Sequence, residues 1–500
     1  MGWKNKMDAA KRGHRPSLKD WTQDGLAHTF PAWRDAIVAR STYENENYEV
    51  QMPPGACHPQ RLPALLDGAR LSYDQFAKEY ETHGIPCVIR NVPVAEGWAA
   101  TERWQMEVLM QDEDLLERKF KCGEDDDGKN IKVKLRHFLQ YMHDNTDDSP
   151  LYIFDSGFDE DRVAHRILTD YKVPSFFRDD LFRLVSERRR PPYRWWLVGP
   201  ERSGTTVHID PLNTSAWNTL IYGKKRWVLF PPNVPKSIIK GKGHIRKGED
   251  DEAIHYFMNI LPRIKETAAR MGNTGDYKDF ACYEFTQHAG ETCFIPLGWW
   301  HAVLNLTHTV GITQNFCSPQ NFAQVWKKTR SGRKMMAAKW LNALDVHYPQ
   351  LADHARYMNQ RDGFIMKYDP ILVKQKEQEK ARRAQLKAYE AKMRQEYARQ
   401  QAAVQGGGSR SHQQQQQQYP PQHKHHHHPG QHHQSAYPTY HRRGGGESPT
   451  HSSTATTETS RSSVSYQGGG GGAPPSNNNN AYAYPVSNHD MKRSRRVSPP

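Results

Sequence analysis

Two residues with metal-binding side chains, His208 and Asp210, stand two positions apart in the segment 204–211. Residues two apart on a β-strand point to the same face, so a strand here would bring the imidazole and the carboxylate together. With a further histidine they would complete the triad of two histidines and one carboxylate that binds iron(II) in non-haem oxygenases. Such a triad leaves coordination positions open for a 2-oxo acid and for dioxygen.

The candidate for the third ligand is His301, which follows a proline, a glycine and two tryptophans in the segment 295–303. The interruption of the chain before an aromatic pair would direct the histidine inward. An H-x-D pattern recurs by chance, and a lone histidine is more often an ordinary core or surface residue. The two elements together, in a chain of barrel-like strands, favour a metal site.

A 2-oxo diacid also needs a cation for its distal carboxylate, and Lys225 is the candidate. It begins a predicted strand, from which its long stem would reach inward, while Lys224 and Arg226 would point outward as solubilising charges. Thr313 can add a hydroxyl group, and Asn218 an amide, to the same pocket. The alternative is that Lys225 is an ordinary lysine at a strand edge.

The elements that would position these residues are short strands separated by Gly, Pro or Asn turns. These runs are rich in aromatic and β-branched residues and lie at 85–90, 151–154, 194–198, 226–230, 292–295 and 310–313. Helical spacing flanks the strands, at 73–80 and after 321, instead of alternating with them. The pattern predicts a mainly β fold, a sandwich or barrel with flanking helices, and disfavours a doubly wound fold.

Composition divides the chain into four predicted parts. The hydrophobic fraction of 36% is below the roughly 45–50% of ordinary globular chains, and runs of Gly, Gln, His and Asn fill the C-terminal part. We predict a basic N-terminal arm (1–60), an oxygenase domain with a helical N-terminal part (61–330), a helical C-terminal extension (331–405) and a disordered low-complexity tail with a basic end (406–500).

The formal net charge of +14 indicates acidic partners or a place among nucleic acids. The basic cluster at 492–496 is either a nuclear-import signal or a solvated run of charge. Six scattered cysteines without a C-x-x-C pair argue against disulfides and structural zinc. No apolar run suits a signal peptide or a membrane span, so we expect an intracellular protein that does not enter membranes.

Four segments carry a resemblance to a known family: 148–156, 189–195, 204–217 and 298–316. Together they resemble the Jumonji-C oxygenases, in the branch with arginine-demethylase and lysyl-hydroxylase activities, from about residue 11 to about residue 340. The resemblance implies a double-stranded β-helix (cupin-like jelly roll) with C-terminal helices. It also implies Fe(II) and 2-oxoglutarate as cofactors, O2 as co-substrate and ascorbate as reductant.

Family roles carry over to matching positions of this chain. The resemblance implies that His208, Asp210 and His301 are the iron ligands and that Lys225 and Thr313 hold the distal carboxylate of 2-oxoglutarate. It places Thr205 and Asn218 at further positions of the cofactor pocket. The stretch 330–334 departs from the Arg-Gly-Arg-Pro segment that family members can carry after the barrel, which disfavours minor-groove DNA binding by that device.

The resemblance further implies lysyl hydroxylation of basic Lys/Arg-rich proteins, such as Arg/Ser-rich splicing factors and histones, with arginine demethylation as a second activity. The expected setting is the nucleoplasm, and also the cytoplasm, in transcription, chromatin regulation and mRNA splicing. A homodimer through the C-terminal helices is a further expectation. The candidates for an acidic substrate-binding rim, each equally well explained as solvated loop charges, are 124–127, 147–148 and 179–180.

Two other classes of function stay open at this point. One is a non-catalytic nuclear scaffold, in which the barrel is a binding module and the tail an interaction arm. The other is an RNA-binding protein that uses the basic helix and tail, where Tyr and Arg are interspersed. A cell-surface receptor for phosphatidylserine is disfavoured, because no segment is predicted to span a membrane.

Overall fold

The computed structural model describes residues 2–39, 60–186, 190–250, 252–272, 274–368 and 370–406. The predicted tail beyond Gly406, its basic cluster at 492–496 and residues 40–59 of the predicted arm lie outside the described residues. Within the described ranges, no helix combines the length and the apolar character needed to cross a membrane.

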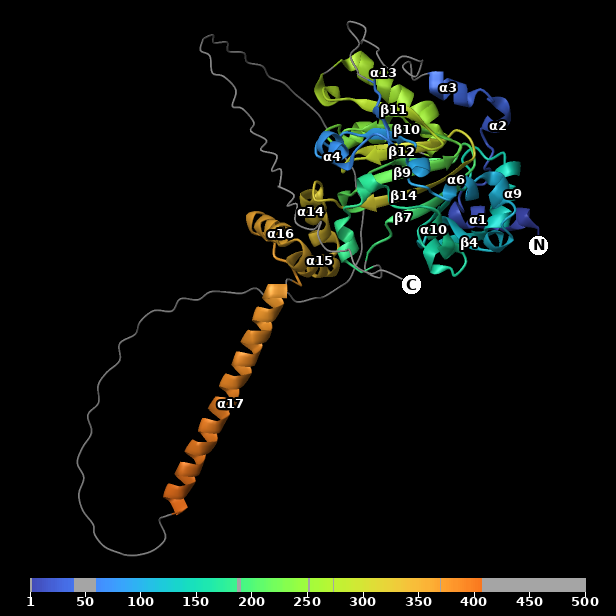
Figure 1. The fold of residues 1–500 in the computed structure, drawn as a ribbon. Coiled ribbons are helices and arrows are strands. Elements are labelled where there is room, and N and C mark those ends of the chain that lie inside the picture. The colour runs from blue at the N-terminus through green and yellow to red at the C-terminus, as the bar shows by residue number, and fades with distance from the viewer. Residues whose placement is uncertain are drawn as a thin grey trace, which may run out of the picture. The chain divides into compact units, whose positions relative to one another are not determined.

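Two mostly antiparallel sheets form the centre of the molecule (Figure 1). The five-stranded sheet has the order β1 (Gln60–Arg61), β11 (Cys282–His288), β10 (Lys224–Phe230), β13 (Trp300–Asn305) and β8 (Gly204–His208). The seven-stranded sheet has the order β2 (Ala64–Asp67), β3 (Cys87–Arg90), β12 (Thr292–Ile295), β9 (Ser215–Tyr222), β14 (Thr309–Phe316), β7 (Arg194–Gly199) and β6 (Ile153–Asp155). Only the described pairs β1·β11 and β2·β3 run parallel.

The chain passes repeatedly from one sheet to the other. Strand β8 belongs to the five-stranded sheet, β9 to the other, β10 and β11 again to the first, and β12, β13 and β14 alternate in turn. This alternation winds the strands into a double-stranded β-helix, and the predicted cupin-like jelly roll with flanking helices is therefore confirmed. β-Branched and aromatic residues suit these strands because their side chains pack well on a pleated surface.

Helices cover both sheets and continue beyond the last strand. Those that frame the barrel and its extension are α1 (Trp3–His14), α3 (Trp33–Ala39), α4 (Tyr73–Phe76), α9 (Leu135–Asp144), α13 (Leu261–Met271), α14 (Phe322–Gly332), α15 (Lys334–His347), α16 (Pro349–Arg361) and α17 (Pro370–Gly406). The described cysteines are all buried and free: Cys87, Cys122, Cys282, Cys293 and Cys317.

Four hydrophobic clusters hold these layers together. The first fills the space between the two sheets, where Trp227 of β10 meets Ile295 of β12. The second packs α1 and α9 against the seven-stranded sheet through residues such as Trp196. The third packs α13 against the five-stranded sheet. The fourth joins α14, α15 and α16 around Trp340. Helices thus pack against the outer face of each of the two sheets.

The long helix α17 presents an apolar stripe to solvent. Leu386, Tyr389, Met393 and Tyr397 are each about half exposed or more. Nothing among the described residues covers this stripe, and dimer formation through the C-terminal helices stays a prediction.

The prediction that Arg226 is a solvent-exposed charge was wrong. Its side chain was expected to point outward as a solubilising charge, but it is 0% exposed. It points to the outer face of the five-stranded sheet, which α13 covers, and there it pairs with the buried Glu284 at 2.9 Å. Lys265 of α13 pairs with the same carboxylate, also at 2.9 Å. The alternation of side chains along the strand predicted the correct face of the sheet for Arg226. Because α13 covers that face, the side chain is buried and not exposed.

Removing one partner of this buried pair should destabilise the fold. We expect Arg226→Met to lower the free energy of unfolding by roughly 3 kcal/mol, because Glu284 would lose its strongest buried counter-charge. The measurement is the urea midpoint of the full chain. The neighbouring exposed residue supplies the matched control, Lys224→Met, which should leave the midpoint unchanged. A wild-type midpoint for Arg226→Met would contradict the prediction.

Candidate active site

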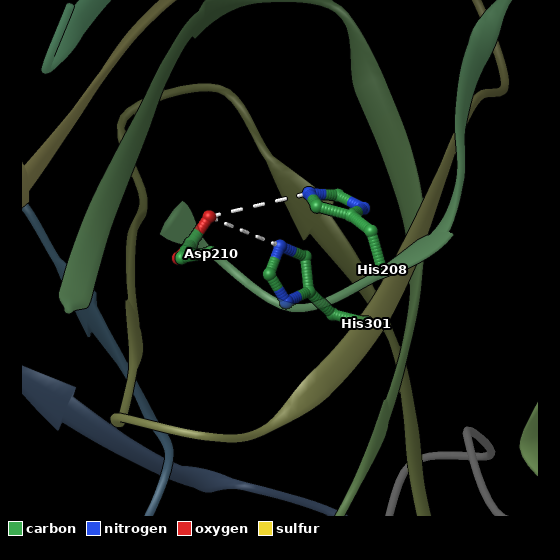
Figure 2. A group of neighbouring side chains, drawn as sticks. All are labelled: His208, Asp210 and His301. Carbon is green, nitrogen blue, oxygen red and sulfur yellow. Dashed lines mark ion pairs between the residues drawn. The ribbon is translucent and has the colours of Figure 1, made fainter. Parts of the chain in front are cut away.

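The structure brings His208, Asp210 and His301 together at one end of the barrel (Figure 2). His208 is the last residue of β8, and His301 of β13 is its direct cross-strand partner. Paired residues of antiparallel strands point to the same face, so the two imidazole rings lie with their centroids 4.2 Å apart. Asp210 lies just past the strand, where the backbone is still extended (φ −60°, ψ 146°). The spacing of two therefore brings it to the same side as His208.

The ligand atoms of these three residues surround a common point. The distance from Asp210 Oδ1 to Nε2 is 4.0 Å for His208 and 3.9 Å for His301. Both distances exceed a hydrogen bond, and all three ligand atoms lie within 4.8 Å of one another. Three electron-pair donors thus face one another around a gap, which is the arrangement that a divalent cation fills.

The imidazole rings are held in the tautomer that a metal requires. His208 Nδ1 bonds to the carbonyl oxygen of Thr206 at 2.8 Å, and His301 Nδ1 to that of Trp299 at 3.2 Å. A carbonyl oxygen can only accept, so Nδ1 carries the proton and Nε2 keeps its lone pair for a ligand.

The charge states of the three residues also favour metal binding. Burial lowers the pKa of each imidazole to about 4, which keeps both rings neutral near pH 7. Burial also raises the pKa of Asp210, against smaller lowering effects from His208 and from a hydrogen bond with Asn315. A buried carboxylate beside two neutral imidazoles favours a cation among them. The donor set, one oxygen and two nitrogens, fits iron(II).

The triad opens into a cavity of about 340 Å³ that Lys225, Asn218, Thr205 and Thr313 also line. The Lys225 side chain is only 3% exposed, and burial lowers its pKa to about 8. Among the described residues, no hydrogen bond or ion pair is formed by its ammonium group, although a buried charge normally needs one. The oxygen of the Asn218 side-chain amide, which can only accept a hydrogen bond, is also buried and unpaired. The Lys225 ammonium is therefore the group on this part of the wall that suits an anionic ligand.

The two threonines already have partners. Thr205 Oγ1 lies 2.9 Å from the hydroxyl of Tyr152, a contact that links the edge of one sheet to the edge of the other. Thr313 donates its hydroxyl proton to the carbonyl oxygen of Trp217 at 2.8 Å. Thr313 would therefore have to rotate its hydroxyl group before donating to a ligand. The structure places all seven predicted site residues on this one cavity.

Most other residues that line the cavity escaped the sequence-based prediction, among them Tyr152, Trp195 and Asn315. Asn315 lies two positions after Thr313 on β14, so the period of two could have identified it. Its amide also donates to Thr214 Oγ1 at 3.1 Å, which fixes its orientation beside Asp210. Nothing local marks Tyr152 or Trp195, because their place depends on how β6 and β7 pair with the rest of the sheet.

The proposed acidic rim needs correction at three of its positions. Asp147, Asp148 and Asp180 are buried, and each is used within the fold. Asp147 pairs with Lys11 at 2.6 Å, and Asp148 accepts from the backbone N–H groups of Asp24 and Leu26. Asp180 pairs with Arg190.

Of the other acidic candidates, Asp179 accepts a hydrogen bond from Tyr73 at 2.6 Å. Glu124 lines a cavity of about 290 Å³ that shares Tyr152, Phe154 and Gly204 with the cavity of the His208–Asp210–His301 group. The candidates at 147–148 and 179–180 thus hold the fold together, whereas Glu124, Asp126 and Asp127 are exposed.

Comparisons with known proteins agree with this geometry. Residues 195–316 match the family model "JmjC domain, hydroxylase". The chain is 40% identical over 348 residues to the "Bifunctional arginine demethylase and lysyl-hydroxylase psr-1" of Caenorhabditis elegans, a match that covers 69% of this chain and 78% of the relative. The protein of the same name from Caenorhabditis briggsae is 42% identical over 286 residues, which cover 57% of this chain and 69% of the relative.

A more distant match is the human "2-oxoglutarate and iron-dependent oxygenase JMJD4". It is 25% identical over 295 residues, which cover 56% of this chain and 67% of the relative.

Proposed function

Because this chain belongs to the JmjC family of Fe(II)- and 2-oxoglutarate-dependent oxygenases, we propose that it hydroxylates lysine side chains of basic Lys/Arg-rich proteins. The observation that carries this proposal is one cavity that holds both the His208–Asp210–His301 group and the unpaired ammonium of Lys225. The name of the relatives, lysyl-hydroxylase, supports lysine as the target.

The residues divide into two groups by what they would hold. His208, Asp210 and His301 would bind the iron, and Lys225 would pair with the distal carboxylate of 2-oxoglutarate. When bound, iron and 2-oxoglutarate supply the oxidation: dioxygen hydroxylates a C–H bond of the target while 2-oxoglutarate is split into succinate and carbon dioxide.

The remaining cavity residues orient these groups and exclude water. Trp227 packs its ring 6.1 Å from that of His301 and donates its indole N–H to Gln287 at 2.8 Å, so it holds the imidazole from one side. Asn315 holds Asp210. Ile295 and Val303 add apolar surface to the wall and keep solvent from the reacting C–H bond.

Arginine demethylation is a second candidate activity, which the name of the same relatives favours. Hydroxylation of an N-methyl group on arginine gives a hemiaminal, which loses formaldehyde and leaves arginine. This reaction needs no additional residue, because the same hydroxylation acts on a different C–H bond.

The proposed substrates are Arg/Ser-rich splicing factors and histones, and the proposed setting is the nucleus. The basic cluster at 492–496 supports a nuclear address. Deleting it from a fluorescently labelled chain should shift the protein to the cytoplasm, and an unchanged distribution would contradict this part of the proposal.

The activity is tested on a peptide. The purified full chain is incubated with Fe(II), ascorbate, 2-oxoglutarate and an Arg/Ser-rich peptide that contains both a lysine and a methylated arginine. Mass spectrometry should show one added oxygen on lysine, absent when Asp210→Ala replaces the wild-type chain. Loss of a methyl group from arginine would make the chain a demethylase. An unchanged peptide together with unconsumed 2-oxoglutarate would favour the non-catalytic scaffold.

The pKa of Lys225 makes 2-oxoglutarate binding dependent on pH. Burial lowers this pKa to about 8, so the free site loses its positive charge as the pH rises past that value. The affinity for 2-oxoglutarate should therefore be constant below about pH 8 and fall above it. Titration calorimetry of the iron-loaded protein without oxygen, between pH 6.5 and 9.5, measures this. Affinity that is flat or rises above pH 8 would count against Lys225 as the carboxylate ligand.

A further inference from the structure

Trp195 lies on the strand next to those of Thr313 and Asn218, and its side chain points into the same cavity. In the seven-stranded sheet, Thr313 of β14 is paired with Asn218 of β9 on one side and with Trp195 of β7 on the other. Directly paired residues point to the same face of a sheet, and all three line the catalytic cavity. The indole ring therefore stands beside the proposed 2-oxoglutarate site, on the β6–β7 side of the sheet.

A second ring stacks on the first. The centroids of Phe154 and Trp195 are 5.3 Å apart, and the ring planes differ by 15°. Tyr152 adds a third ring, 5.9 Å from Phe154. All three rings line the cavity and are only partly buried. An aromatic wall of this kind is apolar surface left partly open inside the catalytic cavity.

Apart from these rings, the described walls of the cavity hold few groups that could bind a cation. Of the described residues that line it, Asp210 carries the only carboxylate, and that group belongs to the proposed iron site. Asp147, Asp148 and Asp180, which could have drawn a cation to the rim, are buried in contacts of their own. A lysine or methylated arginine that enters this cavity therefore meets no carboxylate on its described walls outside the proposed iron site. Glu124 and Glu252 line the adjoining cavity that shares Tyr152 and Phe154, and there they are paired with Lys121 and Arg15.

We propose that Phe154 and Trp195 form the subsite that holds the cationic end of the target side chain. The negative face of an aromatic ring attracts lysine ammonium and arginine guanidinium alike, and the attraction strengthens where water is excluded. Such contacts have little directional demand, so one wall accepts either cation. This inference rests on the proposed function, because it assumes that a basic side chain is the substrate.

The test measures binding separately from the reaction. Three peptides differ only at the target position, which is lysine, methylated arginine or norleucine, the last an uncharged match for the lysine stem. Their affinities are measured on the chain loaded with Fe(II) and 2-oxoglutarate in the absence of oxygen. Wild type should bind both cationic peptides more tightly than the norleucine peptide. Trp195→Leu should weaken the cationic peptides by about tenfold and remove the preference.

Matched variants guard against simple misfolding. Trp195→Phe keeps a ring and should keep most of the preference, whereas Phe154→Leu should lose part of it. Each variant should keep the circular dichroism spectrum of the wild type and bind Fe(II) with wild-type affinity, which shows that the fold and the metal site are intact. A wild type without preference for the cationic peptides, or a Trp195→Leu variant that keeps it, would overturn the subsite. A preference that depends on Trp195 without oxygen transfer to any peptide would instead keep the subsite and contradict the proposed function.

Discussion

Replacing Asp210 with alanine should abolish iron binding and lower 2-oxoglutarate turnover by more than roughly 100-fold. Residues that merely support a metal ligand change affinity or activity by about 10–100-fold, and a ligand itself should exceed that range. The structural reason is the position of Asp210 Oδ1, which faces the Nε2 atoms of both histidines at 3.9–4.0 Å. Without its negative charge, two neutral imidazoles alone would hold a divalent cation weakly.

Iron affinity is measured by metal titration of the apoprotein, and turnover by release of succinate. Asp126→Ala, which removes an exposed carboxylate from the turn between β4 (Lys119–Glu124) and β5 (Asn130–Lys134), is the matched control. The control should behave as wild type. If Asp210→Ala retained both iron and turnover, the His208–Asp210–His301 group would not be the catalytic centre.

Replacing Lys225 with methionine should raise the KM for 2-oxoglutarate by roughly 100-fold, because a charge-assisted contact to a buried carboxylate would be lost and the carboxylate left unpaired. The same variant should be at least as stable as wild type without ligand. Lys225 as a whole is 3% exposed, and no described residue forms an ion pair or hydrogen bond with its ammonium group, so its removal relieves an uncompensated charge in the cavity wall. Loss of binding together with unchanged or higher stability separates a ligand-binding lysine from a structural one.

Steady-state kinetics and thermal unfolding check these two expectations. Lys224→Met, one position away at the exposed first residue of β10, should alter neither quantity. A Lys225→Met variant with a normal KM would assign the distal carboxylate to another group. A variant with a clearly lower Tm would mean that Lys225 serves the fold.

Much of the candidate site could be predicted from local sequence because its key spacings are local. The separation of two between His208 and Asp210, and the inward direction of Lys225 on its strand, follow from the period of a β-strand. The strands themselves follow from runs of aromatic and β-branched residues bounded by turns. The mainly β fold and its flanking helices could be predicted for the same reason.

Only the tertiary structure decided which distant residues meet. His301 lies opposite His208 because β13 pairs with β8 in one register, and no local pattern determines that register. The burial of Arg226 depends on α13 covering the outer face of the sheet. The stack of Phe154 on Trp195 depends likewise on β6 pairing with β7. A short segment determines which side of its strand a residue occupies, but long-range packing determines whether that side meets solvent, a helix or a substrate.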